Sequence, residues 1–307
     1  MNRPARWKSA ALVPLLALAA PAAAQPAPPP TAPAAPVYEL TQVAGPVWRF
    51  RSNAHYGLVM VTAKGAVVID PLNPAAAAWL KAELARRFKG LKVTSVVYSH
   101  HDWDHTAGAA VFGPVPVYAR AESLAALQPP AEPEARARFT KFYANVAWPT
   151  VTWTQKVERI TLGGHTVELH ANPALHAKDL VYAWFPAERV LFTVDVISPH
   201  TLPYRTLDDY APDDVAANLA HALSFKPRYV VGGHGDVAGP DSINALGQYY
   251  ADLRAAVAAG IARGEPLDAI KREVTLDQYK GWRDYGTFRE MNVEGMYRYL
   301  TKPAPAK

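Results

Sequence analysis

Short apolar runs and helical repeats alternate along most of the chain. Runs rich in β-branched and aromatic residues predict strands at residues 47–51, 56–62, 66–70, 94–99, 115–118, 157–162, 166–170, 180–185, 190–194 and 229–231. Apolar residues spaced three and four apart predict helices at residues 74–88, 121–127, 134–146, 213–225, 242–263 and 276–300. Strands and helices mixed in this order predict an α/β sandwich.

Two parts of the chain repeat one order of elements. Each begins with a predicted hairpin whose second strand ends in an aspartate, Asp70 in the first part and Asp195 in the second. A helix follows, and then a strand that leads to a histidine, His100 or His234. Because parallel strands bring their carboxyl ends to one edge of a sheet, His100, Asp195 and His234 are expected to converge there.

The first residues have the pattern of an export signal. "MNRPARWKSAALVPLLALAAPAAAQ" has a basic start, an apolar run over residues 10–20 and a small triplet before Gln25. This predicts a signal peptide over residues 1–24, and therefore a periplasmic or secreted protein. The alternative is a retained membrane anchor, but the run is short and contains Pro14. No cysteine follows the cleavage point, so a lipoprotein is excluded.

Composition separates the remainder into three segments. Residues 25–36, "QPAPPPTAPAAP", are proline-rich and uncharged, which is typical of an extended tether. Residues 37–240 contain the predicted sandwich core. Residues 241–307 form a helical extension rich in Tyr and Trp, expected to pack on the same domain, to line the substrate side or to form a dimer surface.

Charge and cysteine content exclude several classes of protein. The formal charge of +5 falls to +2 without the first 24 residues, which carry Arg3, Arg6 and Lys8 and no acid. We therefore expect no nucleic-acid partner. Nor do we expect stable membrane insertion after cleavage, since no other run is apolar enough. The chain has no cysteine, so any metal site uses His, Asp and Glu alone.

The stretch "VVYSHHDWDHTAG" carries the densest chemistry. Three histidines and two aspartates lie between His100 and His105. A compact loop that leaves a strand can aim several such side chains at one metal ion, whereas a straight strand or helix cannot. In the structural alternative, Asp102 or Asp104 caps the following helix. Capping explains one aspartate but not the three histidines, so a metal site is favoured.

This stretch resembles the His-x-His-x-Asp-His motif of the metallo-β-lactamase superfamily. Further landmarks follow in the order of that family: "NPALHAKDLVYAWFPAERVLFTVDVI" is similar to the segment with the third histidine and the bridging aspartate, and "VVGGHGDV" to the last histidine loop. The resemblance covers residues 37–239. It implies an α/β fold, a four-layer αββα sandwich of the metallo-β-lactamase type.

The resemblance also implies two metal positions. The first would use His100, position 102 and His176, the second would use Asp104, His105 and His234, and Asp195 would bridge both. Position 102 departs from the family, which usually has His there. Either Asp102 ligates through a carboxylate oxygen, which we favour, or the first position is weak. Zinc is the expected metal, with iron or manganese as alternatives because of the added carboxylate.

Other polar and aromatic residues receive outer roles. Asp70 is expected to hydrogen-bond the metal-binding loop, and His101 to point away from the metals as an outer partner. Trp103 and Tyr204 are expected to line the pocket, as is Tyr210. The remaining histidines are interpreted as structural or surface residues: His55, His165, His170, His200 and His221. Aromatic residues of the insertion at 129–153 either cover the pocket mouth or, as slightly favoured, pack a small core of their own.

The function implied is metal-dependent hydrolysis of a small molecule. Two metal ions lower the pKa of a bound water, and the resulting hydroxide attacks an ester, lactone, amide or β-lactam type bond, with Asp104 orienting it. Phosphodiesterase or sulfatase activity is an alternative within the fold. Two rival classes are a metal-binding protein with little or no turnover and an iron-dependent oxidoreductase. Oligomeric state is left open.

Overall fold

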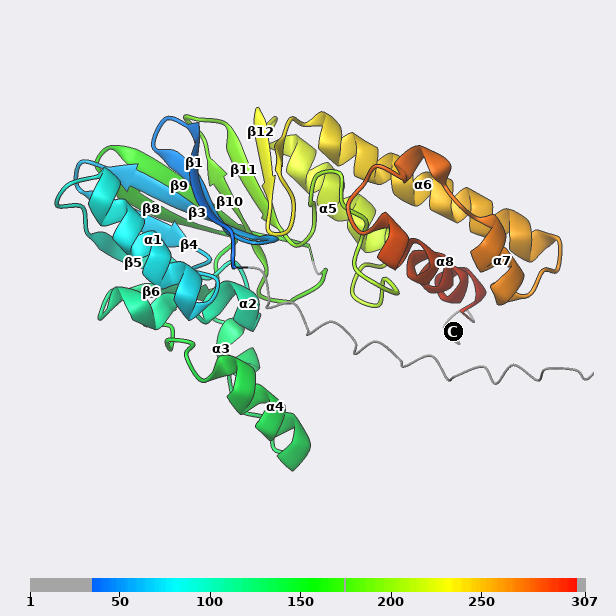
Figure 1. The fold of residues 1–307 in the computed structure, drawn as a ribbon, viewed down its shortest axis with the longest axis horizontal. Coiled ribbons are helices and arrows are strands. Elements are labelled where there is room, and N and C mark those ends of the chain that lie inside the picture. The colour runs from blue at the N-terminus through cyan, green and yellow to red at the C-terminus, as the bar shows by residue number, and fades with distance from the viewer. Residues whose placement is uncertain (1–34, 174, 303–307) are drawn as a thin grey trace, which may run out of the picture. The chain divides into compact units, whose positions relative to one another are not determined.

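The computed structural model describes residues 35–173 and 175–302. The predicted signal peptide lies outside the described residues, as does the predicted tether up to residue 34. Pro36–Lys307 forms one compact unit. Two β-sheets make up its centre (Figure 1).

The first sheet has seven strands in sequence order. Strands β1 to β4 pair antiparallel, whereas β4 to β7 pair parallel. Parallel neighbours must be joined by crossover connections, and α1 provides the first of these between β4 and β5. The strands are β1 (Tyr38–Ala44), β2 (Val47–Ser52), β3 (His55–Thr62), β4 (Gly65–Ile69), β5 (Val93–Val97), β6 (Val117–Arg120) and β7 (Val151–Trp153).

The second sheet has six strands in the order β13-β12-β11-β10-β9-β8. All neighbours are antiparallel except β11 and β12, which are parallel and joined by α5. The repeated order of elements read from the sequence is thus present, with β3-β4-α1-β5 in one sheet and β10-β11-α5-β12 in the other. The strands are β8 (Val157–Leu162), β9 (His165–Ala171), β10 (Val181–Phe185), β11 (Val190–Val194), β12 (Tyr229–Gly232) and β13 (Val237–Ala238).

Three hydrophobic layers hold the unit together. In β4, Val67 and Ile69 face the second sheet, and Ala66 and Val68 face the helices on the other side. Successive side chains of a strand alternate between faces, so a strand covered on both faces must be apolar at every position. This explains the continuous apolar runs of β4, β10 and β11, and gives the predicted αββα order of layers.

The helices fall into two outer layers and an extension. On the first sheet lie α1 (Pro74–Arg87), the 3₁₀ turn Ala109–Phe112 and the segment of α3 (Ser123–Ala126). Next to the second sheet lies α5 (Pro212–Ser224), and α6 (Asp241–Ala262) packs on α5. Helix α8 (Tyr285–Thr301) packs on α6 and on α7 (Leu267–Glu273), and these three helices reach away from the strands (Figure 1). The short α2 (Trp103–Thr106) follows β5, and α4 (Pro133–Tyr143) lies apart from the sheets (Figure 1).

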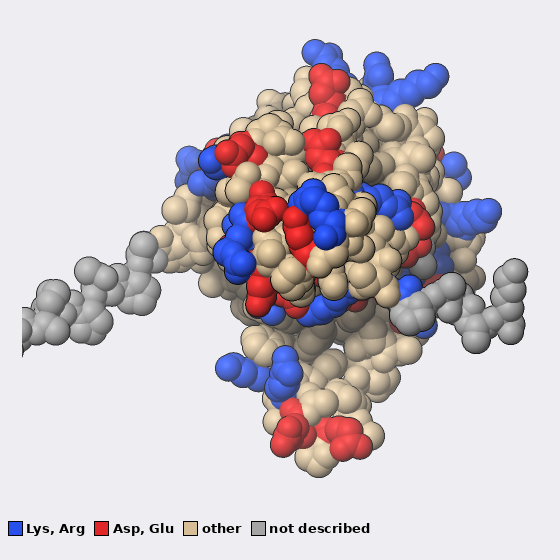
Figure 2. All heavy atoms as spheres, turned by 90° about the vertical axis from the view of Figure 1, so that its right-hand side faces the viewer, with Lys and Arg blue, Asp and Glu red and all other residues tan. Residues whose placement is uncertain are grey.

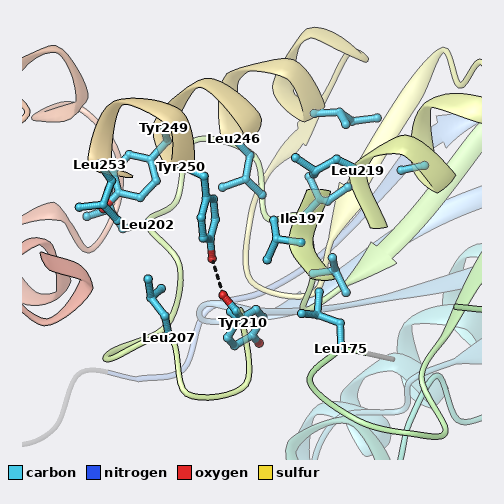
Figure 3. Packing of buried hydrophobic residues seen from close by; sticks show 14 of the residues in the cluster. Leu175, Ile197, Leu202, Leu207, Tyr210, Leu219, Leu246, Tyr249, Tyr250 and Leu253 are labelled. Atoms are coloured by element: carbon cyan, nitrogen blue, oxygen red, sulfur yellow. Dashed lines mark hydrogen bonds between the residues drawn. The ribbon is translucent and has the colours of Figure 1, made fainter. Parts of the chain in front are cut away.

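The C-terminal helices share a core with the loop that follows β11. Tyr250 of α6 donates a hydrogen bond to the carbonyl of Tyr210 across 3.4 Å, and Leu202, Leu207 and Leu246 pack around them (Figure 3). The side chain of Asn292 in α8 donates to the carbonyls of Pro203 and Arg205 at 2.9 and 2.6 Å. The extension thus docks on the sandwich and fixes the loop at residues 202–210.

The predicted elements need four corrections, three to the strands and one to a helix. Each predicted strand is present with ends that differ by at most two residues, but β1, β7 and β13 were not expected. β1 is a polar edge strand, and the other two have three and two residues. The predicted helix at 276–300 is wrong: Leu276 and Asp284 have φ of 50° and 62°, so the chain turns there and α8 begins only at Tyr285.

The surface of the C-terminal end mixes both charges. Figure 2, which views the unit from the right-hand side of Figure 1, shows acidic and basic side chains interspersed over this face. Among residues 35–173 and 175–302, no helix combines the length and the apolar character needed to cross a membrane.

Candidate metal centre

The carboxyl ends of strands from both sheets meet at one edge. His100 follows β5, Asp195 follows β11 and His234 follows β12. His176 comes from the loop between β9 and β10, where its backbone N–H donates to the carbonyl of Asp209 at 3.0 Å. The convergence expected from the order of elements is therefore present: His100, Asp195 and His234 all follow the carboxyl ends of strands and lie in the same cluster of ligands.

The first group of ligand atoms contains His100, Asp102, His176 and Asp195. Asp102 Oδ2 lies 3.4 Å from His100 Nε2 and 3.2 Å from His176 Nε2. Asp195 Oδ2 lies 3.5 and 3.4 Å from the same two nitrogens. Four donors bound to one ion at zinc–ligand lengths lie ~3.4 Å apart, so these spacings suit a shared cation.

The second group is built around the other oxygen of Asp195. Its Oδ1 lies 3.2 Å from His105 Nε2 and 3.2 Å from His234 Nε2. Asp104 Oδ2 lies 3.8 and 3.9 Å from these nitrogens and completes the set. One carboxylate thus presents a separate oxygen to each group, which is the geometry of a bridge between two positions.

Unpartnered atoms at the centre test whether a cation fits. The buried Nε2 atoms of His100, His105 and His176 have no hydrogen-bond partner, nor does Oδ1 of Asp195. Such groups are normally satisfied when buried. The residues present therefore fit metal ions.

The electrostatics of the site point the same way. Burial would lower the pKa of His176, but the facing carboxylates of Asp102 and Asp195 outweigh burial and raise the pKa to about 10. Burial would raise the pKa of Asp195, yet the positive charges of His105 and His234 hold it far below its usual range. The carboxylates thus draw positive charge into the site, and protons supply that charge where no metal ion does.

The opposite face of three histidine rings is fixed by hydrogen bonds. Asp70 Oδ2 lies 3.0 Å from Nδ1 of His105 and accepts from the hydroxyl of Ser99, whose Oγ lies 3.0 Å from Nδ1 of His100. The hydroxyl of Tyr210 lies 3.2 Å from Nδ1 of His176. Outer partners of this kind orient a ring so that Nε2 faces the metal. Asp70 thus contacts the metal-binding loop, where the sequence placed it.

His101 points out of the two groups. Its Nδ1 lies 2.9 Å from Oδ1 of Asp179, and the other oxygen of Asp179 accepts from the hydroxyl of Ser123 at 2.6 Å. Asp102 occupies the position before α2 but makes no side-chain capping bond. The capping interpretation of Asp102 is therefore wrong, since its carboxylate faces His100 and His176.

Known proteins share both the motifs and the fold. The family model described as the metallo-beta-lactamase superfamily matches residues 52–234. The chain belongs to the metallo-β-lactamase superfamily. The His/Asp groups described above lie within the matched residues and give the chain a candidate metal site. The family and fold predicted from the motifs are confirmed.

Solved structures of the superfamily resemble the chain at low sequence identity. A double mutant of the sec-alkyl sulfatase PisA1 matches with a TM-score of 0.68 and 18% identity over 87% of this chain. The stereoselective inverting sec-alkylsulfatase Pisa1 from Pseudomonas sp. matches at 0.64 and 18% over 86%. The present chain spans about half of these two proteins, 52% and 50%.

A second kind of neighbour is matched over its full length. The metallo-beta-lactamase from Pontibacter korlensis has a TM-score of 0.57 and 19% identity, with 70% of this chain and 99% of that chain covered. No protein of curated function matches the chain significantly in sequence. At these identities the likeness shows the fold of the superfamily alone.

A cavity of about 550 Å³ opens beside the two groups. Trp103 and Tyr204 line it with 38% and 53% of their surface exposed, and Tyr210 lines it from below His176. The C-terminal extension supplies Arg283 and Phe288 to its wall. Other apolar lining residues include Val196, Leu202, Leu246 and Tyr250. The extension therefore lines this cavity as well as docking on the sandwich.

The insertion does not form a core of its own. Helix α4 has no buried residue, and its Phe142 stacks on Trp103 with ring centroids 4.8 Å apart. Trp153 instead belongs to β7 and is buried between the sheets. The favoured expectation for the insertion is thus wrong: Phe139 and Tyr143 stack on each other but no residue of α4 is buried, and Phe142 supports the cavity wall through Trp103.

Sequence reasoning missed two side chains at this metallo-β-lactamase-type site. His55, interpreted as structural, has its Nε2 3.4 Å from Asp104 Oδ2 and groups with Asp104 and His234. Asp179, which had no predicted role, holds His101. A signal for His55 existed: it begins the strand antiparallel to the one ending at Asp70, so it starts at the same edge of the sheet.

Proposed function

We propose that this protein hydrolyses a small-molecule ester, lactone, amide or β-lactam bond with two divalent metal ions, of which zinc is the first expectation. The observation that carries the proposal is the carboxylate of Asp195, whose two oxygens face separate groups of histidines at 3.2 to 3.5 Å. A bridging carboxylate between two such groups is the mark of a two-metal site.

The ligands would divide between two positions. His100, Asp102 and His176 would hold the first ion, His105, His234 and Asp104 the second, and Asp195 both. When bound, the ions polarise the substrate oxygen and lower the pKa of water towards neutrality. Asp70, Ser99 and Tyr210 keep the rings aimed at these positions.

Asp104 is the residue proposed to handle the proton. Its Oδ2 faces the second group, while its Oδ1 makes no hydrogen bond within the described residues. This oxygen is able to accept a proton from the attacking water and deliver it to the leaving group. Burial would raise the pKa of Asp104, but the positive charge on His105 and the nearby imidazole of His55 hold the pKa below its usual value, so the carboxylate is ionised at neutral pH.

The cavity sets the size and character of the substrate. About 550 Å³ suits a small molecule rather than a polymer. Its apolar lining by Leu202, Leu246 and Phe288 favours a substrate with a hydrophobic body, positioned so that its reacting bond faces the metal groups. We expect neither nucleic acid nor a stable membrane-inserted form to be involved.

Sulfate-ester hydrolysis is the second candidate function. Arg283 lines the cavity, is half-buried and forms no ion pair with an acidic side chain in the described part of the chain. A guanidinium in this position favours a substrate with an anionic group. The neighbouring Asp284 also lines the cavity, which limits that preference to anions placed on the side of Arg283. The fold neighbours named as sec-alkylsulfatases make this bond class worth testing.

The proposed place of action is the periplasm or the extracellular space. The basic start, the apolar run and the small triplet before Gln25 support export and cleavage. An exported enzyme meets extracytoplasmic substrates, which favours lactones, β-lactams and alkyl esters over cytoplasmic thioesters. Mass spectrometry of the mature N-terminus would test the cleavage.

The proposed function is tested with a substrate panel and a chelator. Protein purified without added metal is analysed for zinc, iron and manganese, and then assayed on carboxylic esters, lactones, amides, β-lactams and sulfate esters. Dialysis against a strong chelator should abolish turnover, and added metal should restore it. Turnover that survives complete metal removal would overturn the proposal, and bound metal without turnover of any substrate would favour the non-catalytic alternative.

A further inference from the structure

His55 lies at the catalytic edge because of a short hairpin. It is the first residue of β3 and pairs with Ser52 of β2 across a turn at Asn53, whose φ of 55° closes the hairpin. β3 is antiparallel to β4, so its first residues lie beside the end of β4 and Asp70. The hairpin thus delivers an imidazole to the edge where the two groups of ligands meet.

The start of β3 packs closely against neighbouring backbone at this edge. A Cβ on Gly57 would lie 2.3 Å from the carbonyl of Asp70, so only glycine lets the strand approach this closely. The backbone N–H of Tyr56 donates to the carbonyl of Gly233 at 2.8 Å, next to His234. Both contacts fix the backbone of the two residues that follow His55 relative to the metal-binding loops.

The side chain of His55 faces the second group. Its Nε2 lies 3.4 Å from Asp104 Oδ2, and its ring meets that of His234 edge-on with centroids 4.8 Å apart. The ligand atoms of His55, Asp104 and His234 all lie within 4.8 Å of one another. The 3.4 Å between His55 Nε2 and Asp104 Oδ2 equals the distance between Asp102 Oδ2 and His100 Nε2 in the first group.

We propose that His55 is an additional ligand of the second metal position. The inference rests on the proposed two-metal function and assigns a residue that the family motifs leave out. His55 shares one group with Asp104 and His234, and His234 shares a second group with His105 and Asp195, so His234 joins the two. With His55 included, the second position would have three imidazoles, whereas the first has two imidazoles and the carboxylate of Asp102. The first position thus has one imidazole fewer than the family motif, because of Asp102, and the second has one more, because of His55.

The two positions consequently differ in metal preference. An imidazole-rich position favours zinc, whereas added carboxylate shifts a site towards harder ions such as manganese or iron. We therefore expect zinc to fill the second position first when it is added to metal-free protein. The first position should accept manganese or iron more readily than the second.

The alternative role for His55 is a hydrogen bond that orients Asp104. Two variants separate these roles. Replacing His55 with Gln removes the ligand but keeps an amide N–H that can donate to Asp104, whereas Glu supplies a new ligand oxygen and repels Asp104. Ligation predicts that H55Q loses more zinc affinity at one position than the ~10–100-fold typical of outer partners, and that H55E recovers most of it. Orientation alone predicts the reverse order.

Zinc affinities are measured by competition with a chromophoric chelator on the mature protein, with circular dichroism as a check on folding. His165→Gln is the matched control, because His165 is as exposed as His55, 40% against 38%, and lies 3.3 Å from the carboxylate of Glu188 away from the site. It should leave both affinities unchanged. A crystal structure of the zinc-loaded protein provides a direct readout, with Nε2 of His55 expected about 2.1 Å from the ion.

The outcomes test His55 ligation separately from the proposed hydrolytic function. Ligation would be overturned if H55Q kept both zinc affinities, or if His55 did not contact the ion in a zinc-loaded structure. Metal-dependent turnover by the wild type would still support the proposed function in that case. Wild-type protein that binds no zinc would overturn both. Loss of one affinity in H55Q with rescue in H55E establishes His55 as a ligand even where no substrate has been found.

Discussion

Nε2 of His176 lies 3.2 Å from Oδ2 of Asp102, although the two residues come from loops that follow strands of different sheets. This contact places the carboxylate that departs from the family motif in the same space as the imidazoles of the first group. The carboxylate of Asp102 therefore faces His100 and His176 and adds a negative charge to the first group.

Replacement of Asp102 by Ala should empty the first metal position. The change removes the oxygen that faces both His100 and His176, so two imidazoles and one shared carboxylate oxygen remain. Inductively coupled plasma mass spectrometry should find metal content lowered from two ions towards one. In the matched variant Asp102→His, metal content should be no lower than in the wild type, with zinc favoured further over manganese. Equal metal content in the Ala variant would contradict the assignment.

Replacement of Asp195 by Asn should weaken both positions together. Each oxygen of Asp195 serves one group, and the negative charge balances the positive charge drawn to His105, His176 and His234. Loss of one position only, with the other at wild-type affinity, is the result that would exclude a bridging role. Isothermal titration with zinc should show both binding phases weakened by more than the ~10–100-fold typical of outer partners.

The carboxylate of Asp70 should affect metal binding without touching a metal. It is fully buried, accepts from the backbone N–H and hydroxyl of Ser99, and contacts Nδ1 of His105. Asp70→Asn should lower zinc affinity at the second position by about 10–100-fold. Ser99→Ala removes one of these partners and should have a smaller effect. A stability loss in Asp70→Asn with unchanged zinc affinity would show that Asp70 serves the fold alone.

Docking of α8 should be sensitive to a single methyl group. A Cβ on Gly295 would lie 2.0 Å from the carbonyl of Thr206, in the loop held by Asn292. Gly295→Ala should lower the free energy of unfolding by about 1–3 kcal/mol, because the overpacked helix and loop must separate. Gly286→Ala is the control in the same helix, since nothing lies within 4 Å of its added Cβ. It should be neutral or slightly stabilising in denaturant unfolding.

Loop displacement in Gly295→Ala should also reach the metal site. The loop at residues 202–210 ends in Tyr210, whose hydroxyl lies 3.2 Å from Nδ1 of His176. We expect a weaker first metal position in this variant, measured by the same chelator competition used for His55. Unchanged metal affinity in a destabilised Gly295→Ala protein would show that the extension supports the fold but not the site.

The order of elements and the main ligands could be read from the sequence because both depend on local patterns. Alternation of apolar residues revealed the strands, and the ends of those strands placed His100, Asp195 and His234 at one edge. The dense run of histidines and aspartates from His100 to His105 identified the main metal-binding loop. Each of these signals lies within a few residues, so it needs no knowledge of distant contacts.

Tertiary structure alone decided which oxygen faces which histidine, and which other residues join them. His55 enters the site because an antiparallel hairpin returns to the edge formed by β4, and Asp179 because it faces the outward ring of His101. The break before α8 arises where Leu276 and Asp284 turn the chain, so that Asn292 and Gly295 meet the loop below. Such contacts join residues far apart in the chain, and no local periodicity encodes them.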